Sequence, residues 1–307
     1  MLNLKDGVHT LRYWAAMREQ QRAHSEPSDT ETLKNTVRAA VPDLDSHLRN
    51  LERNGVSCIR SYWSDRQCQA AQQELDRLMQ AQPQCVRRYS NDSDKRLFGA
   101  ETAGPAIRLF HDDPILKSAG EILAGLTLYN FATLGARIDA TAANRGSGEG
   151  WHRDAFGFQF KAIIYLCDVT DENGPFEYVC GSHKAWQASL DSARGRFPIP
   201  PDSRIDSSSM DKMIAAGELK PRRFTAKAGT VLLVNTAGVH GGAQLKSGHR
   251  YALTNYYYFP YQIGKSIVEK FLPLAPGVQE RLQPFLEAER AFAASTPSAQ
   301  NRDHHAG

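Results

Sequence analysis

The sequence has few cysteines and no long apolar run, and these absences exclude several classes of protein. Its five cysteines are odd in number, scattered and free of any Cys-x-x-Cys pair, so we expect free thiols rather than a disulfide framework or a zinc cage. No run approaches ~18 consecutive apolar residues, and the first residues lack a basic segment followed by an apolar one. We therefore expect no membrane span and no secretory signal, and we expect a cytoplasmic protein.

The chain also lacks a strong charge of either sign. Its 307 residues carry 37 Lys+Arg against 34 Asp+Glu, which gives a formal net charge of +3. This balance disfavours a basic nucleic-acid-binding module. Hydrophobic residues make up 41% and charged residues 23%, as in ordinary globular proteins, and this composition is too apolar for a disordered chain.

Helix signals dominate the first 125 residues. Ser64 and Gln67 form a capping box before an apolar stripe at helical spacing. Asp113 followed by Pro114 predicts the start of a second helix that Gly125 can terminate. Residues 56–59 are expected to form one short strand within this helical region.

The second half of the chain has a different pattern. Short β-rich runs, separated by turns rich in Gly, Asn and Pro, predict an all-β sandwich or barrel, with strands over residues 126–133, 137–141, 158–169, 230–234 and 250–259. The polar, Pro-rich segment 187–226 interrupts them and is typical of a lid. We therefore expect one domain, in which a dependent helical region (1–125) packs on a β core (126–294), followed by a flexible tail (295–307).

Four side chains of the β region suggest a metal centre. His152 and Asp154, two residues apart on an expected strand, point to the same side and can chelate one ion. His240 follows a buried strand, and two histidines with one carboxylate form the facial triad of non-heme Fe(II) oxygenases. Each residue alone has an ordinary structural interpretation, so the prediction rests on their order.

A facial triad on octahedral iron leaves three coordination sites open. A 2-oxoacid can occupy two of them through its carboxylate and ketone, and O2 can take the third. A distal carboxylate on that oxoacid needs a cationic partner, for which a planar guanidinium is the best side chain. Arg250, ten residues after His240, can supply it.

Residues 51–259 resemble the phytanoyl-CoA dioxygenase family of Fe(II)/2-oxoglutarate-dependent oxygenases. The resemblance covers about two-thirds of the chain and rests on an ordered set of segments: 51–56, 150–154 (Gly-Trp-His-Arg-Asp), 173–176, 181–184, 228–231, 240–242 (His-Gly-Gly) and 248–251.

The resemblance implies a double-stranded β-helix (jelly-roll, cupin-like) core with flanking helices. It implies Fe(II) bound by His152, Asp154 and His240, with Arg250 on the distal carboxylate of 2-oxoglutarate and O2 as the oxidant. Further candidate contacts to 2-oxoglutarate are Thr254, Tyr129 and Asn130. The family's halogenating members lack the metal-binding carboxylate, so Asp154 favours hydroxylation or a related oxidation of a small molecule.

The sequence offers fewer candidate contacts for the substrate than for iron and 2-oxoglutarate. The lid contains several arginines, among them Arg194 and Arg196. They are either solvated surface charges or a cationic rim that attracts an anionic substrate, such as a carboxylate, a phosphate or an acyl thioester. Tyr256 belongs to an aromatic cluster and can line the pocket.

Two other functions compete with the oxygenase. One is a non-catalytic jelly-roll binding or sensor protein, which has no reason to retain all four site residues. The other is a zinc hydrolase with the same ligands, which needs a general base, and Glu149 and Glu177 are the candidates near the motif.

Overall fold

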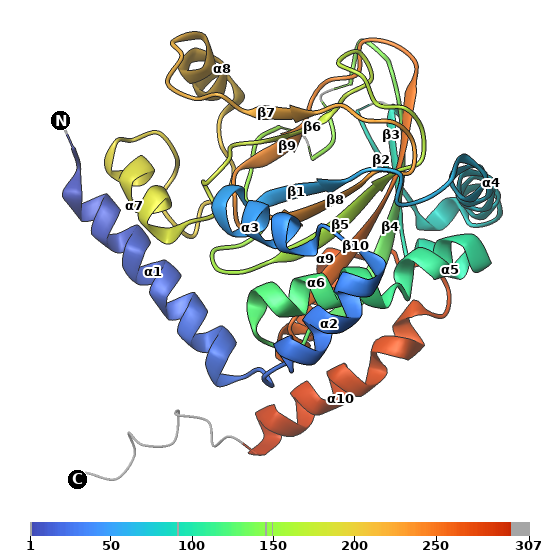
Figure 1. The fold of residues 1–307 in the computed structure, drawn as a ribbon, viewed down its shortest axis with the longest axis horizontal. Coiled ribbons are helices and arrows are strands. Elements are labelled where there is room, and N and C mark those ends of the chain that lie inside the picture. Colours follow the sequence, from blue (N-terminus) through green and yellow to red (C-terminus); the bar gives the residue numbers. More distant parts are fainter. Residues whose placement is uncertain (1, 91, 145, 149, 296–307) are drawn as a thin grey trace, which may run out of the picture.

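The computed structural model describes residues 2–90, 92–144, 146–148 and 150–295. Two antiparallel sheets form its core (Figure 1). The strands of the larger sheet, in spatial order, are β1 (Val56–Ile59), β8 (Val231–Asn235), β5 (Phe160–Tyr165), β10 (His249–Tyr258), β4 (Tyr129–Asp139), β3 (Asp94–Phe98) and β2 (Val86–Tyr89). Those of the smaller sheet are β7 (Arg222–Phe224), β6 (Phe176–Tyr178) and β9 (His240–Gly242).

Helices cover the outer face of the larger sheet and one end of the molecule (Figure 1). The α-helices are α1 (Leu4–Ala23), α2 (Thr30–Ala40), α3 (Leu44–Asn54), α4 (Asp65–Ala81), α5 (Pro105–His111), α6 (Pro114–Ala124), α7 (Ala185–Ala193), α8 (Ser207–Ala215), α9 (Lys265–Lys270) and α10 (Val278–Ser295). Short 3-10 turns are η1 (Pro83–Cys85), η2 (Ala100–Thr102) and η3 (Pro260–Gln262). No helix in the described ranges is long and apolar enough to cross a membrane.

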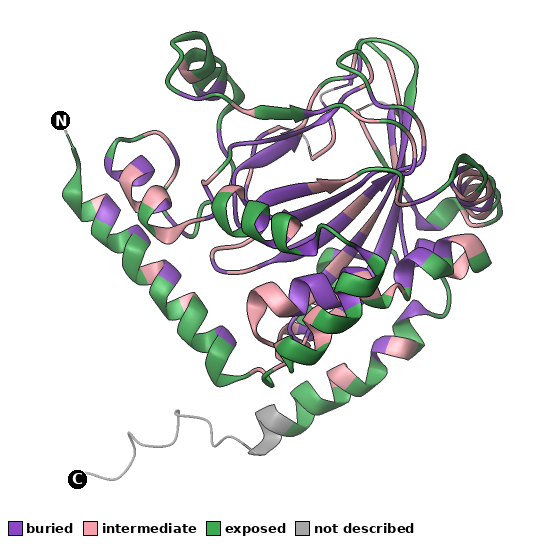
Figure 2. Ribbon diagram, viewed as in Figure 1, coloured by how far each residue is buried: buried purple, intermediate pink, exposed green. Residues whose placement is uncertain are grey.

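Strand β10 lies at the centre of the larger sheet and separates the core from a cavity. Its residues alternate between the two faces. Leu253 and Tyr257 join the apolar cluster against α4, α5 and α6, whereas Ala252, Thr254 and Tyr256 line the cavity. Burial is concentrated in these central strands and in the helix faces turned toward them (Figure 2).

Several local predictions are confirmed. The capping box of Ser64 and Gln67 opens α4, and the Asp113 carboxylate caps α6, which ends at Gly125 in the left-handed conformation. The expected strand at residues 56–59 is β1, at one edge of the larger sheet.

Other predictions were wrong. The two strands expected over 126–133 and 137–141 are the single strand β4, because Leu134 to Ala136 continue the ladder with β10. The region expected to hold one strand before residue 125 also contains β2 and β3. These strands are rich in Arg and Lys and lie at a sheet edge, where charge is tolerated and the apolar pattern is weak.

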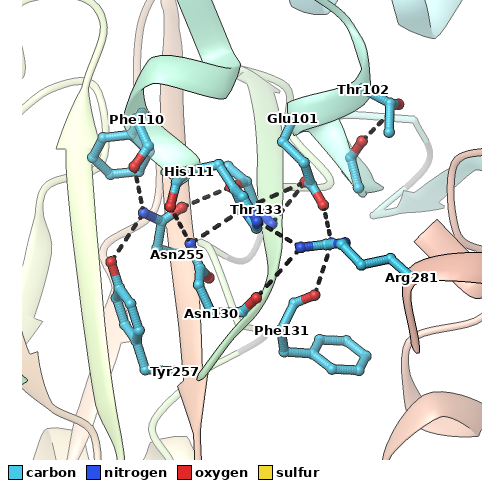
Figure 3. A network of polar contacts seen from close by, with 11 residues as sticks. Glu101, Thr102, Phe110, His111, Asn130, Phe131, Thr133, Asn255, Tyr257 and Arg281 are labelled. Atoms are coloured by element: carbon cyan, nitrogen blue, oxygen red, sulfur yellow. Dashed lines mark hydrogen bonds and ion pairs between the residues drawn. The ribbon is translucent and has the colours of Figure 1, made fainter. Parts of the chain in front are cut away.

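A buried polar network ties α10 to the outer face of the larger sheet (Figure 3). The Arg281 guanidinium donates to the Glu101 carboxylate and, at 2.6 Å, to His111 Nε2. Nδ1 of His111 contacts Thr133 Oγ1 at 2.9 Å, and Thr133 Oγ1 donates to Asn255 Oδ1 at 2.7 Å. Because a guanidinium can only donate, His111 must be neutral in this network.

This network predicts loss of stability in acid. Burial, and then Arg281, lowers the pKa of His111 to about 3. An unfolded histidine takes up its proton near pH 6.5, so stability falls as the pH drops through the window between these values, by about 1 kcal/mol per pH unit. We expect urea denaturation of His111→Asn to show a shallower decline over this window than the wild type. If the free energy of unfolding fell equally with pH in the two proteins, the assignment of a neutral, buried His111 would be contradicted.

Candidate metal centre and its cavity

A cavity of ≈ 360 Å³ lies between the two sheets. The larger sheet contributes its inner face, through Leu134 and Ala136 of β4, Lys161, Ile163 and Tyr165 of β5, and Arg250, Ala252, Thr254 and Tyr256 of β10. The opposite wall comes from Phe176 of β6, from β9, from residues 147–148 and 152–154, and from Ser203 and Arg204.

The three predicted metal ligands meet in this cavity. The ligand atoms of His152, Asp154 and His240 all lie within 4.8 Å of one another. Nε2 of His152 is 3.6 Å from Asp154 Oδ1, and Nε2 of His240 is 3.4 Å from Asp154 Oδ2. The arrangement offers two imidazole nitrogens and one carboxylate on one side of a possible ion, with the open cavity beyond.

The backbone that places these ligands differs from the prediction. Residues 152–154 are not a regular strand. Instead, His152 and His240 exchange two backbone hydrogen bonds of 2.9 Å, an isolated antiparallel bridge between the motif and β9. The expectation that strand alternation aligns His152 with Asp154 was therefore wrong, and this bridge positions the two histidines.

The imidazole rings are held in the form that a metal requires. Nδ1 of His152 lies 2.9 Å from Gly150 O, and Nδ1 of His240 lies 2.9 Å from Gly238 O. A carbonyl oxygen can only accept, so both Nδ1 atoms carry the proton and both Nε2 atoms present a lone pair to the cavity. Burial, and then the neighbouring His240, lowers the pKa of His152 to about 3, which keeps this ring neutral.

Asp154 is ionised and has a partner that the sequence analysis missed. Lys161 Nζ lies 2.7 Å from Asp154 Oδ2, and the Lys161 side chain is 8% exposed. Although burial favours the neutral acid, the Lys161 ammonium holds the pKa of Asp154 well below its usual range. Lys161 is the lone charge in the β5 run Phe-Lys-Ala-Ile-Ile-Tyr, and a single charge in an otherwise apolar strand could have identified it.

Arg250 lies on the same inner face of β10, as predicted for a carboxylate-binding residue. Its side chain is buried and donates to the carbonyl oxygen of Gly174. Among the described residues, no carboxylate lies within the 4 Å of an ion pair with Arg250. A buried guanidinium without an anionic partner fits an anionic ligand, because burial of an unpaired charge is costly.

The other predicted contacts divide into two groups. Thr254 and Tyr256 line the cavity. Tyr129 and Asn130 do not. The register shift between Tyr256 and Tyr257 places Asn130 opposite Tyr257, on the helix-covered face of the sheet. The Tyr129 ring packs on Phe285 instead, and Asn130 donates to His111 O at 2.7 Å in the network of Figure 3. Neither residue therefore lies where the prediction placed it, and a role as a 2-oxoglutarate contact stays a prediction.

The two lid arginines predicted as substrate contacts do not line the cavity. Arg194 is exposed, and Arg196 pairs with Asp191 and Glu218, because both arginines follow α7 at the outer surface. Their role as substrate contacts stays a prediction. The arginine of this segment that reaches the cavity is Arg204, which donates to Gly148 O at 2.7 Å.

Gly242 has no room for a side chain. A Cβ atom built there would lie 2.7 Å from both the Cβ and the backbone nitrogen of Ser147. Both residues line the cavity, so the 147–148 loop occupies the space that a hydroxyl-bearing residue at position 242 would need.

The structure describes one of the two candidate bases of the hydrolase hypothesis. Glu177 pairs with Arg223 at 2.7 Å and does not line it. Glu149 lies outside the described residues. Within the part of the lining that the structure describes, Asp154 is the single carboxylate, and it is one of the proposed ligands.

The chain is similar to a known protein family and to a known enzyme. The model of the phytanoyl-CoA dioxygenase (PhyH) family matches residues 51–252. An L-proline trans-4-hydroxylase of Streptomyces griseoviridis is 26% identical over 234 residues, which cover 69% of this chain and 84% of the relative.

Solved structures agree on the fold. The epimerase SnoN in complex with Fe3+, alpha ketoglutarate and nogalamycin RO matches with a TM-score of 0.56 at 17% identity, covering 72% of this chain and 85% of that one. EctD from S. alaskensis with bound Fe matches with a TM-score of 0.54 at 16% identity, covering 70% and 76%. The expectation of a jelly-roll core with flanking helices is confirmed.

Proposed function

The chain belongs to the phytanoyl-CoA dioxygenase family of Fe(II)/2-oxoglutarate-dependent oxygenases, and from this premise we propose how its residues carry the reaction. It is an oxygenase that uses Fe(II), 2-oxoglutarate and O2. We assign the iron to Nε2 of His152, Nε2 of His240 and the carboxylate of Asp154. The observation that carries this assignment is the pair of Nδ1–H donations to carbonyl oxygens, which leaves both Nε2 atoms free beside an ionised carboxylate.

The remaining groups of the cavity bind and orient the organic reactants. Bound iron and 2-oxoglutarate supply the oxidative decarboxylation that yields succinate and CO2 and oxidises a C–H bond of the substrate. Arg250 holds the distal carboxylate of 2-oxoglutarate, and Thr254, four residues along the same face of β10, offers a hydroxyl. The apolar side chains of Leu134, Ile163 and Phe176 limit the access of water.

Segment 187–226 is proposed as the lid of this cavity. It contributes Ser203 and Arg204 to the lining, while α7 packs on α1. Its apolar side chains join Trp151 and Val239, next to the two ligand histidines, in one cluster that also contains Phe197, Ile205, Met210 and Leu219. Residues 1–125 are proposed to fold as part of the same domain, because β1 and β2 are the two edge strands of the larger sheet and β3 pairs with β4.

We propose hydroxylation of a small carboxylic acid as the reaction. The relative of 26% identity hydroxylates L-proline, and the presence of Asp154 favours oxygen transfer over halogenation. We place the enzyme in the cytoplasm, because all five cysteines are free thiols.

Turnover tests this function. With Fe(II), 2-oxoglutarate and L-proline or related amino acids, we expect O2 uptake matched by succinate, and a hydroxylated product for at least one compound. Zn(II) in place of Fe(II) is expected to give no O2 uptake. Hydrolysis supported by Zn(II), or the complete absence of 2-oxoglutarate-dependent O2 uptake, would favour the hydrolase or the binding protein instead.

A further inference from the structure

A lysine is buried at the metal centre, where burial of an apolar side chain would cost less free energy. Lys161 Nζ contacts Asp154 Oδ2 at 2.7 Å and lies 3.9 Å from the centre of the Tyr256 ring. An ammonium has three N–H donors, so these two contacts leave one donor for a ligand in the cavity that Lys161 lines. Removal of an ammonium from water is costly unless opposite charge compensates it.

Asp154 alone cannot supply that compensation once the site is loaded. Its Oδ2 atom also faces His240 Nε2 at 3.4 Å, so Lys161 shares the carboxylate with the metal ligands. Fe(II) and 2-oxoglutarate carry equal and opposite charges and cancel. Asp154 then balances only one of the three buried cations of the described lining, which are Arg153, Lys161 and Arg250, while the partly buried Arg96 is paired with Asp94. The cavity therefore retains positive charge that an anionic substrate group would neutralise.

Lys161 of β5 and Arg250 of β10 lie toward opposite ends of the inner face of the larger sheet. Lys161 is the cross-strand partner of Tyr256, and Arg250 lies six residues earlier on the same face. Six residues of strand span about 20 Å between backbone positions. Lys161 is therefore separated from the residue that holds the distal carboxylate of 2-oxoglutarate, with the metal ligands on its own side of the cavity.

From this placement, we propose that the Lys161 ammonium binds a carboxylate of the primary substrate, with the Tyr256 ring as the adjoining wall. The proposal rests on the oxygenase function above and adds the residue that selects an acidic substrate. The chemistry recognised is a carboxylate, and the C1 carboxylate of 2-oxoglutarate is the competing source, which the experiment distinguishes.

The test compares Lys161→Gln with the wild type, because glutamine removes the charge but can still donate to Asp154. Proteins loaded anaerobically with Fe(II) are titrated first with 2-oxoglutarate and then with small carboxylic acids, beginning with L-proline, each paired with its carboxamide. The visible metal-to-ligand absorption band reports both binding steps without turnover. Lys161→Arg retains the charge. Lys227→Gln removes a surface lysine paired with Asp168 and serves as the matched control.

We expect the wild type and Lys227→Gln to bind an acid about 10- to 100-fold more tightly than its carboxamide. Lys161→Gln should lose this preference for the acid, while its Kd for 2-oxoglutarate stays within about threefold of the wild-type value. Lys161→Arg should keep most of the preference for the acid. Weaker 2-oxoglutarate binding with an unchanged acid preference would assign Lys161 to the cosubstrate and overturn the proposal. A wild type that binds acid and carboxamide alike, or neither, would also overturn it. A wild type without any band would instead refute the proposed function.

Discussion

His152→Ala is expected to abolish Fe(II) binding at the site and, with it, all 2-oxoglutarate-dependent O2 uptake. The substitution removes one of three ligands, and loss of groups that merely orient a ligand already lowers metal affinity by about 10- to 100-fold. We therefore expect the affinity for Fe(II) to fall on the order of a hundredfold or more. Equilibrium dialysis under anaerobic conditions measures the affinity, and an oxygen electrode measures the turnover.

His183→Ala is the matched control for this experiment. His183 is a buried histidine whose Nε2 lies 3.1 Å from Glu52 O, and it does not line the cavity. This variant should bind one equivalent of Fe(II) with the affinity of the wild type, even if its melting temperature falls. Retention of wild-type Fe(II) binding by His152→Ala would refute the ligand assignment.

Arg250→Met is expected to weaken 2-oxoglutarate binding severely while Fe(II) binding persists. Truncation of one partner of a buried, hydrogen-bonded charge pair costs about 2–5 kcal/mol, which corresponds to a rise in Kd of about 30-fold to several thousandfold. The band that follows anaerobic 2-oxoglutarate addition measures this Kd. Arg250→Lys should recover part of the affinity, since an ammonium retains the charge but not the paired donors of a guanidinium.

Arg137→Met provides the comparison. Arg137 lies on the adjacent strand β4, pairs with Asp76 and Asp139, and does not line the cavity. Its loss should leave the Kd for 2-oxoglutarate unchanged. Equal effects of the two arginine variants would show that net charge, rather than a specific site at Arg250, controls binding of the cosubstrate.

The candidate ligands could be predicted from the sequence because each carries its chemistry in its residue type and order. His152, Asp154, His240 and Arg250 converge on one cavity although the strand expected at residues 152–154 does not form. The backbone bridge between His152 and His240, 88 positions apart in the sequence, supplies the alignment instead, and no local pattern encodes such a long-range contact.

Contacts that depend on strand register could not be predicted in the same way. Thr254 and Tyr256 follow Arg250 at even spacing and do line the cavity. The position of Asn130 depends on the pairing of β4 with β10, where an irregularity of one residue changes the face that a side chain occupies. The position of Tyr129 depends on its contact with Phe285 of α10, far along the chain. Lys161 was missed because its significance arises only from Asp154 and Tyr256, which lie on other segments.

Anaerobic addition of 2-oxoglutarate to the Fe(II)-loaded wild type tests the central claim most directly. Because the oxoacid must coordinate iron held by the three side chains, we predict a visible charge-transfer band that saturates at one equivalent of each. Appearance of this band in the wild type and its loss in His152→Ala would support the account. A folded, iron-containing wild type that develops no such band would contradict it.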